Sequence, residues 1–331
     1  NNQRTQIKHL KHCLAILLGV TLIAACSKDD SSDNTIVNEN RNVTGGFYCT
    51  NNLEFPHLKG GTSKVIVYTA TSVDEGKYGM NFAVEWDCNK KSNRWSCYRF
   101  DTSNRQTGKR KDGSNVVRWY PNDKSYPGSS YGDKKDPSRT YPFDYKNLAD
   151  SEMLEDLYYG SGCDHGHLCP SADRLYSQEA NIETFFMTNM MPQYSKFNQD
   201  GIWIDMENKT RSLARTLTDT DTLYIVKGGT IDSEANILER IQGKLIVPKY
   251  YYAAFLMWRP LNGSTDRNSA SNYKAMAYWF PHGKSADKSS SLEDIMISID
   301  DLELRTGIDF FCNLPDKVEV KVESTLSKNA W

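Results

Sequence analysis

The sequence has little of what marks a membrane-embedded, repetitive or strongly basic protein. No long apolar run occurs after residue 25, and 38% of the 331 residues are hydrophobic, which excludes a polytopic membrane protein and a disordered chain. No repeat with a period of about 20 to 50 residues is visible, and no proline-rich or acidic linker follows residue 45, which favours one globular domain. The 40 basic residues do not outnumber the 42 acidic ones, so a polyanionic ligand would need a local basic surface.

The first 25 residues resemble an export signal. Basic residues precede an apolar run, Cys13–Ala25, which is shorter than the roughly 20 residues that span a bilayer. The run ends in Ile23-Ala-Ala-Cys26, which resembles a bacterial lipobox and implies cleavage before Cys26 and lipid attachment to its thiol. An ordinary signal with a chance cysteine is the alternative.

The residues after Cys26 are polar and acidic, and we expect residues 26–44 to form a solvated tether. Lys28-Asp29-Asp30 resembles the export signal of surface lipoproteins in the Bacteroidota. The resemblance implies a lipoprotein in the outer membrane of a Gram-negative bacterium, exposed at the cell surface. Six further cysteines allow three disulfides in fifteen connectivities, and the sequence does not choose among them.

Strand and helix patterns alternate along the rest of the chain. Strands are predicted at 65–68, 81–86, 94–100, 222–226, 244–247 and 250–258, the second and third of them as a hairpin. Helices are predicted at 150–158, 178–186 and 201–213, and an irregular surface segment at 101–145. This order predicts a single mixed α+β domain over residues 45–331.

One short segment, Gly162–Arg174, is dense in groups that carry chemistry, with two histidines, two aspartates and two cysteines. A first interpretation is a zinc cluster, although all of its ligands would come from one short segment. A second is a structural histidine pair in a loop. A third is a general-base histidine beside an oxyanion substrate. The ligands of the zinc cluster would be Cys163, His165, His167 and Cys169.

Three blocks in the sequence resemble one family. The first is Asp164-His-Gly-His167, followed by small residues and Asp173. The second runs from Thr188 to Glu207, with Asn-Met-Met-Pro-Gln, Asn-Gln, Gly-Ile-Trp and Met-Glu in that order, and the third is Thr306–Pro315. Together they resemble the DNA/RNA non-specific endonucleases of the ββα-metal type, over roughly residues 45 to 331. The resemblance implies a central antiparallel sheet flanked by helices, with a ββα-metal core.

The resemblance also implies a reaction and its residues. The enzyme would hydrolyse DNA and RNA to 5′-phosphate ends with one hydrated Mg²⁺, or Mn²⁺ in its place. His167 matches the family's general base, which suits an imidazole near neutral pH. Asn198 matches the metal ligand and Glu207 a residue that holds metal-bound water. Asn189 matches a position that supports the site.

Two departures from the family pattern concern this site. His165 replaces an arginine, and a histidine binds phosphate as a cation only when it is protonated. Asp200 is an extra residue between Asn198 and Glu207, which would place the pair on opposite sides of a continuous helix. We therefore expect the extra residue to be absorbed before the helix begins near Gly201.

Further phosphate contacts are predicted less directly. Arg174 follows the first block and is a candidate for the nucleic-acid backbone, with a structural salt bridge as the alternative. Arg118 matches a family arginine near the scissile phosphate. It also belongs to a basic and aromatic stretch that either lines a groove for nucleic acid or is simply solvated. That stretch comprises Lys109, Arg110, Lys111, Arg118, Trp119 and Tyr120.

Two other functions compete with an endonuclease. A phosphodiesterase acting on small phosphoesters would use the same His167, Asn198 and Mg²⁺, and the acidic net charge favours it. A surface-binding lipoprotein whose site has decayed through His165 and Asp200 is the non-enzymatic alternative. Binding alone does not require a base beside a metal ligand, which argues against decay.

Overall fold

The computed structural model describes residues 36–43, 49–70, 79–104, 132–133, 136–140, 145, 147–285 and 290–328. The chain divides into two units, Asn1–Ile36 and Val37–Trp331, and the architecture below is that of the second. The leader, Cys26 and the basic stretch with Arg118 lie outside the described residues, so the predictions made for them stay predictions. Within the described ranges, no helix combines the length and the apolar character needed to cross a membrane.

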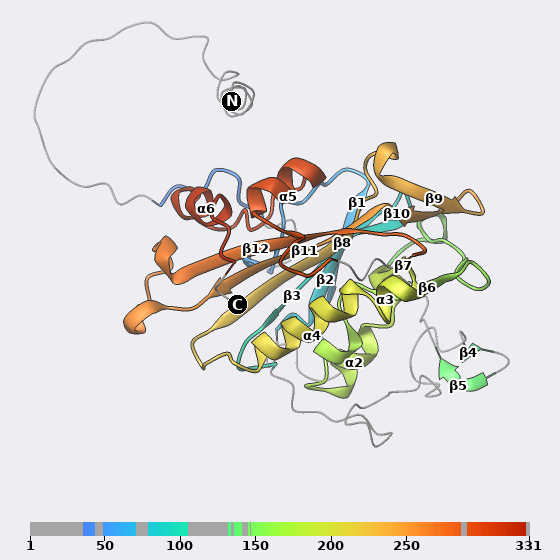
Figure 1. The fold of residues 1–331 in the computed structure, drawn as a ribbon, viewed down its shortest axis with the longest axis horizontal. Helices are drawn as coiled ribbons and strands as arrows, with labels where there is room; N and C mark the ends of the chain where they lie inside the picture. The colour runs from blue at the N-terminus through green and yellow to red at the C-terminus, as the bar shows by residue number, and fades with distance from the viewer. Residues whose placement is uncertain are drawn as a thin grey trace, which may run out of the picture. The chain divides into compact units, whose positions relative to one another are not determined.

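A seven-stranded antiparallel sheet forms the centre of the molecule, with the strand order β1-β2-β3-β8-β11-β12-β13 (Figure 1). Most of its strands carry apolar and aromatic side chains on both faces, as in a sheet covered on both sides. The strands are β1 (Ser63–Tyr68), β2 (Phe82–Asp87), β3 (Ser92–Phe100), β8 (Thr222–Gly229), β11 (Tyr250–Trp258), β12 (Tyr273–Pro281) and β13 (Met296–Ile297).

Three small two-stranded sheets and five helices complete the described structure. The small sheets are β6 (Cys163–His167) with β7 (Met190–Tyr194), β9 (Ile237–Ile241) with β10 (Leu245–Pro248), and β4 (Gly132–Asp133) with β5 (Asp136–Thr140). The helices are α2 (Gln178–Glu183), α3 (Ser195–Asn198), α4 (Ile202–Ala214), α5 (Ile299–Thr306) and α6 (Asp316–Glu323). Single 3₁₀ turns are η1 (Asp150–Glu152), η2 (Ser171–Asp173), η3 (Met187–Asn189), η4 (Glu234–Asn236), η5 (Leu261–Gly263) and η6 (Ala270–Asn272).

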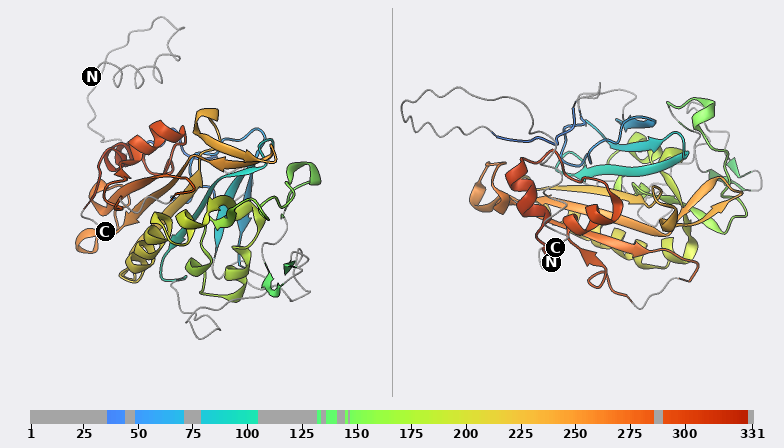
Figure 2. Two further views of the ribbon diagram at one scale, coloured as in Figure 1. Left: turned by 45° about the vertical axis from the view of Figure 1, so that its right-hand side comes forward. Right: turned by 90° about the horizontal axis from the view of Figure 1, so that it is seen from above.

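The helices cover both faces of the sheet, so the domain has three layers. Helices α2, α3 and α4 lie on one face and α5 and α6 on the other (Figures 1 and 2). Strand β11 shows how its sequence serves both: Tyr251 and Phe255 enter the core under α4, and Tyr252 and Leu256 enter the core under α5 and α6. With this period of two, Tyr251 and Tyr252 pack against opposite faces of the sheet.

The predicted α+β class is confirmed, with two differences in detail. The helix predicted at 150–158 is wrong, because only η1 forms there and residues 153–158 continue without a helix. The packed body also begins before the predicted end of the tether at residue 44. Asn42 is buried, donates to Thr50 O and Pro56 O at 3.2 and 2.9 Å, and accepts from Leu58 N at 2.9 Å.

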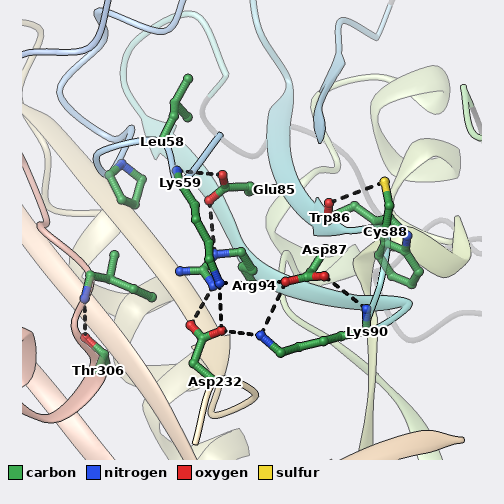
Figure 3. Close-up of polar contacts among 12 residues, drawn as sticks. Leu58, Lys59, Glu85, Trp86, Asp87, Cys88, Lys90, Arg94, Asp232 and Thr306 are labelled. Carbon is green, nitrogen blue, oxygen red and sulfur yellow. Dashed lines mark hydrogen bonds and ion pairs between the residues drawn. The ribbon is translucent and has the colours of Figure 1, made fainter. Parts of the chain in front are cut away.

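An ion-pair network ties the β2–β3 hairpin to the segment after β8 (Figure 3). The carboxylate of Asp232 contacts Arg94 at 2.5 Å, Lys90 at 2.6 Å and Lys59 at 3.1 Å, and Arg94 also reaches Glu85 at 3.3 Å. Burial opposes ionisation of Asp232, but the hydrogen bond from Lys90 and the charge of Arg94 outweigh it and lower the pKa of Asp232 to about 2. The network therefore joins distant segments through a carboxylate that stays charged.

Candidate active site

The first two sequence blocks form one β-hairpin-like pair followed by two helices. Strands β6 and β7 are antiparallel, with His165 opposite Pro192 and His167 opposite Met190. Helices α3 and α4 follow β7 directly, and α3 packs against both strands. The hydroxyl of Tyr251 donates to Pro192 O at 2.6 Å, which fixes the pair to the central sheet. The chain thus builds a ββα unit around the Asp-His-Gly-His segment.

Glycine is required in the middle of that segment. A Cβ atom on Gly166 would lie 2.4 Å from the Cδ and Oε1 atoms of Gln193. Gln193 is fully buried, so its side chain has little room to move away. The close approach of the two strands therefore explains why a residue without a side chain stands between the two histidines.

His167 is the last residue of β6 and is partly buried. Its ring meets Phe185 edge-on, with ring centroids 5.0 Å apart. The chain immediately after it is held by Asn189, whose side chain accepts from Cys169 N and donates to Cys169 O, both at 2.9 Å. The position of His167 is therefore defined by the strand on one side and by this clamp on the other.

Asn189 has a positioning role in this geometry. Its amide also accepts from Ser96 Oγ at 3.0 Å and donates to Thr184 O at 2.9 Å, and the residue has no exposed surface. All of its hydrogen-bonding capacity is used inside the protein. Its buried side chain therefore positions the segment that follows His167.

Asn198 lies at the end of α3 and reaches back to the first block. Its Nδ2 donates to Asp164 Oδ2 at 3.1 Å, and the same carboxylate accepts from Gln199 at 2.8 Å and from Ser195 at 2.7 Å. Among the described residues, Asn198 Oδ1 receives no hydrogen bond. Asp164 thereby turns the amide oxygen of Asn198 away from itself. Asp164 belongs to the first sequence block, but no role was predicted for it from the sequence.

The extra residue Asp200 is absorbed between the two helices, as predicted. Helix α3 ends at Asn198, and α4 begins at Ile202 with Gly201 as its N-cap. A Cβ on Gly201 would lie 2.4 Å from Lys196 O, so this sharp turn needs glycine. Because the helix is interrupted, the spacing from Asn198 to Glu207 does not follow the period of a continuous helix.

Glu207 stands in a buried charged cluster beneath α4. Its carboxylate lies 3.5 Å from Arg211, one turn later, and Arg211 contacts Asp173 at 3.1 Å. Burial raises the pKa of Glu207, and the charges of Lys227 and Arg211 oppose this rise. Lys227, on β8, is itself fully buried, and burial lowers its pKa. Arg211 forms an ion pair with each of the two carboxylates, whereas Nζ of Lys227 has no hydrogen-bond partner among the described residues.

Neither Arg211 nor Lys227 was predicted from the sequence as a site residue. Arg211 follows Glu207 by four residues on a helix that was predicted, and this spacing could have revealed the pair. Lys227 carries no such signal, because it comes from a strand 20 residues further on. Only the fold brings it to Glu207.

His165 is engaged by a carboxylate and a tyrosine. Its Nε2 lies 3.1 and 3.2 Å from the two oxygens of Asp156, and its ring stacks on Tyr158 at 4.1 Å between centroids. Burial raises the pKa of Asp156, but the hydrogen bond and charge of His165 outweigh it, so the pKa lies below its ordinary value. The side chain of His165 keeps 24% of its surface exposed. It is therefore accessible, but a phosphate would compete with Asp156 for it.

Arg174 occupies a different place from the one expected of a substrate-binding residue. It is fully buried, donates to Arg99 O at 3.0 Å and to Asn81 O at 3.3 Å, and lies over the rings of Tyr98 and Phe100 at 4.7 and 4.8 Å. A guanidinium without exposed surface does not reach a phosphate. The structure thus corrects the expected substrate contact: Arg174 is a core residue, held by carbonyl acceptors and cation–π contacts.

The zinc-cluster interpretation does not fit the structure. Among the described residues, the ligand atoms of Cys163, His165, His167 and Cys169 do not converge on one point. Residues two apart on a strand are separated by about 6.6 Å, and Cys169 is buried in the core. Burial raises the pKa of its thiol to about 12. All six cysteines of the described body are free thiols.

A cleft of about 770 Å³ opens beside the segment that leads to Asp156. Its lining includes four basic side chains, of which Arg240 and Lys244 are paired with Glu234 and Glu155 at 2.5 and 2.6 Å. The cleft therefore offers basic groups with part of their charge already compensated. The four are Lys90, Lys91, Arg240 and Lys244.

The residues around Asn198 fit a hard divalent cation. An amide oxygen, such as Oδ1 of Asn198, is a ligand type that Mg²⁺ prefers. The carboxylate of Asp164, 34 residues earlier in the chain, holds the amide through its Nδ2 and leaves Oδ1 pointing away from the carboxylate. Nearby thiols are buried and protonated, so a soft metal has no comparable ligand set here.

The chain belongs to the DNA/RNA non-specific endonuclease family, whose model matches residues 62–317. It is 30% identical over 211 residues to a nuclease of Nostoc sp., an alignment that covers 64% of this chain and 71% of that protein. It is 29% identical over 166 residues to the mitochondrial nuclease of Saccharomyces cerevisiae, covering 48% and 49% of the two chains.

Human mitochondrial endonuclease G is 26% identical over 165 residues, covering 47% of this chain and 51% of the human protein. The chain thus spans about half the length of these two mitochondrial relatives. A solved structure of an EndoG/EndoGI complex is 15% identical and covers 70% of this chain and 83% of that one, with a TM-score of 0.46. Membership of the family confirms the predicted class of enzyme, a hydrolase acting on nucleic acids.

Proposed function

We propose that this protein is a metal-dependent endonuclease that hydrolyses phosphodiester bonds of DNA and RNA and leaves 5′-phosphate ends. The observation that carries the proposal is the hydrogen bond between Asp164 and Asn198. It joins the histidine block to the asparagine and glutamate block in one ββα unit. The absence of any groove-reading motif in the sequence is consistent with recognition of the backbone rather than of bases.

His167 is the group we assign to proton transfer. Attack of water on phosphorus requires that the water lose a proton, and a neutral imidazole accepts one near neutral pH. The strand pairing of β6 and the Asn189 clamp hold the histidine in one place. A fixed base lowers the entropic cost of reaching the reactive arrangement.

Asn198 is the residue we assign to Mg²⁺, or to Mn²⁺ in its place, with Asp164 beside it. When bound, the cation would act as a Lewis acid that stabilises the negative charge of the phosphate oxygens. Glu207 would hold water of the cation's hydration shell, and the charges of Lys227 and Arg211 oppose the rise in its pKa that burial causes. His165 would contact a phosphate oxygen when protonated.

The lipid anchor is a further part of the proposal. Its support is the leader, in which an apolar run ends at Cys26. An enzyme with this anchor would lie in the outer membrane of a Gram-negative bacterium and face the cell surface. Metabolic labelling with a palmitate analogue should mark the wild-type protein and leave Cys26→Ser unmarked. Equal labelling of the two would remove the anchor from the proposal.

Digestion of supercoiled plasmid tests the activity. The purified protein should cut the plasmid with Mg²⁺ and not with EDTA, and His167→Ala should lower the rate by at least about a hundredfold, since general-base catalysis contributes about 10² to 10⁴. Asn198→Ala should require far more Mg²⁺ for the same rate. His57→Ala is a matched control, because His57 is exposed and distant in sequence.

A folded wild-type protein that leaves plasmid and RNA intact across pH and metals would refute the endonuclease. In that case bis(p-nitrophenyl) phosphate separates the remaining alternatives. Hydrolysis of this small diester that depends on His167 would indicate a phosphodiesterase, and no hydrolysis would indicate a binding protein.

A further inference from the structure

Helices α5 and α6 bring carboxylates together on the face of the sheet opposite the ββα unit (Figures 1 and 2). Asp300 and Glu303 lie three residues apart on α5, and Glu323 is the last residue of α6. One carboxylate oxygen of each lies within 4.8 Å of the other two. Three carboxylate oxygens from two helices therefore lie close enough together to surround one ion.

Glu323 supplies a second and independent observation. The residue is only 5% exposed, and its Oε1 has no hydrogen-bond partner among the described residues. No lysine or arginine in the described ranges forms an ion pair with Asp300, Glu303 or Glu323. Glu323 also stands at the carboxyl end of α6, where the helix dipole disfavours a negative charge. A buried carboxylate without a counter-charge is costly. A bound cation would supply the counter-charge that Glu323 lacks.

The surrounding groups add further negative charge next to the three carboxylates. Asp309 and Glu319 stand next to the cluster and receive hydrogen bonds from Asn40 at 3.1 and 2.8 Å. Burial, followed by the charge of Asp309, raises the pKa of Glu303 to about 8. Burial and the charge of Glu303 raise the pKa of Glu323 well above its ordinary range. Two further carboxylates therefore stand beside the three, and a cation would compensate the negative charge gathered at this place.

We propose that Asp300, Glu303 and Glu323 form a calcium-type divalent cation site that fastens α5 to α6. Carboxylate oxygens are the ligands that Ca²⁺ prefers, at about 2.3 to 2.6 Å. The three oxygens lie within 4.8 Å of one another, which is close enough for one ion to contact all of them. Mg²⁺ gives up its water reluctantly, so a site built from three protein carboxylates suits Ca²⁺ better.

Thermal unfolding of the full chain tests this site. Millimolar CaCl₂ should raise the Tm of the wild-type protein by about 5 °C relative to EDTA, and Glu323→Gln should remove the rise. In EDTA, Glu323→Gln should be at least as stable as wild type, because a neutral amide of the same size replaces a buried carboxyl group that has no cationic partner. Calorimetric titration should show Ca²⁺ affinity weakened at least about tenfold by Asp300→Asn. Asp300 is half-buried, so this change should disturb the fold less than a change at the buried Glu323.

Two control variants separate this site from its surroundings. Glu293→Gln changes an exposed acid in the segment before α5 and should keep the full rise in Tm. Asn198→Ala alters the proposed nuclease site and should also keep it, whereas Glu323→Gln should leave plasmid digestion unchanged. A wild-type Tm that does not respond to Ca²⁺, or an equal rise in Glu323→Gln, would overturn the proposal. In that case the carboxylates share protons instead.

Discussion

His165 shows how the type of side chain at one position bears on phosphate binding. It stacks on Tyr158, and its Nε2 contacts the carboxylate of Asp156, so a phosphate would compete with that carboxylate for the ring. An arginine at the same position would carry a permanent charge and could bind two phosphate oxygens. The identity of this residue therefore bears on substrate binding more than on the chemical step.

We expect His165→Arg to lower the KM for DNA about tenfold, because arginine adds a permanently charged donor and one charge-assisted hydrogen bond has about this size. Steady-state digestion of a fluorescent duplex measures this. His57→Arg, at an exposed position, controls for the added charge. An unchanged KM would mean that residue 165 does not face the phosphate.

His282 gives the fold a pH dependence of its own. It is buried, its Nε2 accepts from Tyr194 N at 3.0 Å, and its Nδ1 donates to Pro248 O at 2.8 Å. The ring is therefore neutral when it holds the junction of β7 and α3. Burial lowers its pKa to about 4, against the opposing hydrogen bond to Pro248.

Because the unfolded chain binds this proton near pH 6.5 and the folded chain only near pH 4, stability should fall as the pH drops between these values. The full loss is about 3 kcal/mol. Urea unfolding at pH 7.5 and pH 5 should show a smaller difference for His282→Gln than for wild type, whereas the exposed His57→Gln should match wild type. Equal pH dependence in all three would contradict the assignment.

Which site residues the sequence reveals depends on how far apart they lie. Asn198 and Glu207 belong to one block, and the resemblance of that block to the family predicted their roles. Asp164 stood in the motif, but only the contact with α3 gave it a role. Asp156 and Lys227 carry no local signal, because their partners come from other segments and a lone charge in a loop or strand has many uses.

At the scale of elements, length and periodicity decided what could be predicted. Helix α4, predicted at 201–213, forms at Ile202–Ala214, and β11 has the predicted bounds. Strand β6 was not predicted, since Asp, His and Gly favour strands poorly, and it exists because β7 pairs with it. The predicted helix at 150–158 fails where Asp156 accepts from Tyr158 N at 3.0 Å, a local bond that competes with helix formation.

The break between α3 and α4 gives a prediction at this scale. Gly201→Ala places a Cβ against Lys196 O, at 2.4 Å, and Phe197 O, at 2.8 Å. These are backbone atoms, so the two helices must separate, and we expect a loss of about 2 kcal/mol in unfolding free energy. Plasmid digestion should then need more Mg²⁺, because Asn198 sits at the end of α3.

Gly283→Ala is the matched control, since a Cβ there meets nothing within 4 Å. Chemical denaturation and an Mg²⁺ titration of plasmid cutting measure both effects. A Gly201→Ala protein as stable and as responsive to Mg²⁺ as Gly283→Ala would show that the junction tolerates a side chain.

For the whole molecule, the segment before the sheet matters as much as the helical layers. Asn38 donates to Leu314 O at 2.7 Å, Asn40 binds Asp309 and Glu319, and Asn42 N donates to Asn313 at 3.0 Å. Residues 38–42 thus cross to the segments around α6, nearly 300 positions later. Composition alone assigned them to the tether, because asparagine-rich, polar stretches are typical of linkers and the partners lie far away in the sequence.

This placement predicts where the folded body starts. A chain that begins at Val37 should unfold at the same Tm as the full chain, whereas one that begins at Gly45 should lose several degrees. Asn42→Ala isolates the main cause: it removes the partner of Leu58 N and of Pro56 O, which should cost about 2 kcal/mol. Glu39→Ala, at an exposed position whose backbone N–H alone bonds to Asp316 at 3.1 Å, should cost almost nothing. If the chain from Gly45 is as stable as the chain from Val37, residues 37–44 belong to the tether after all, and the asparagine contacts contribute no net stability.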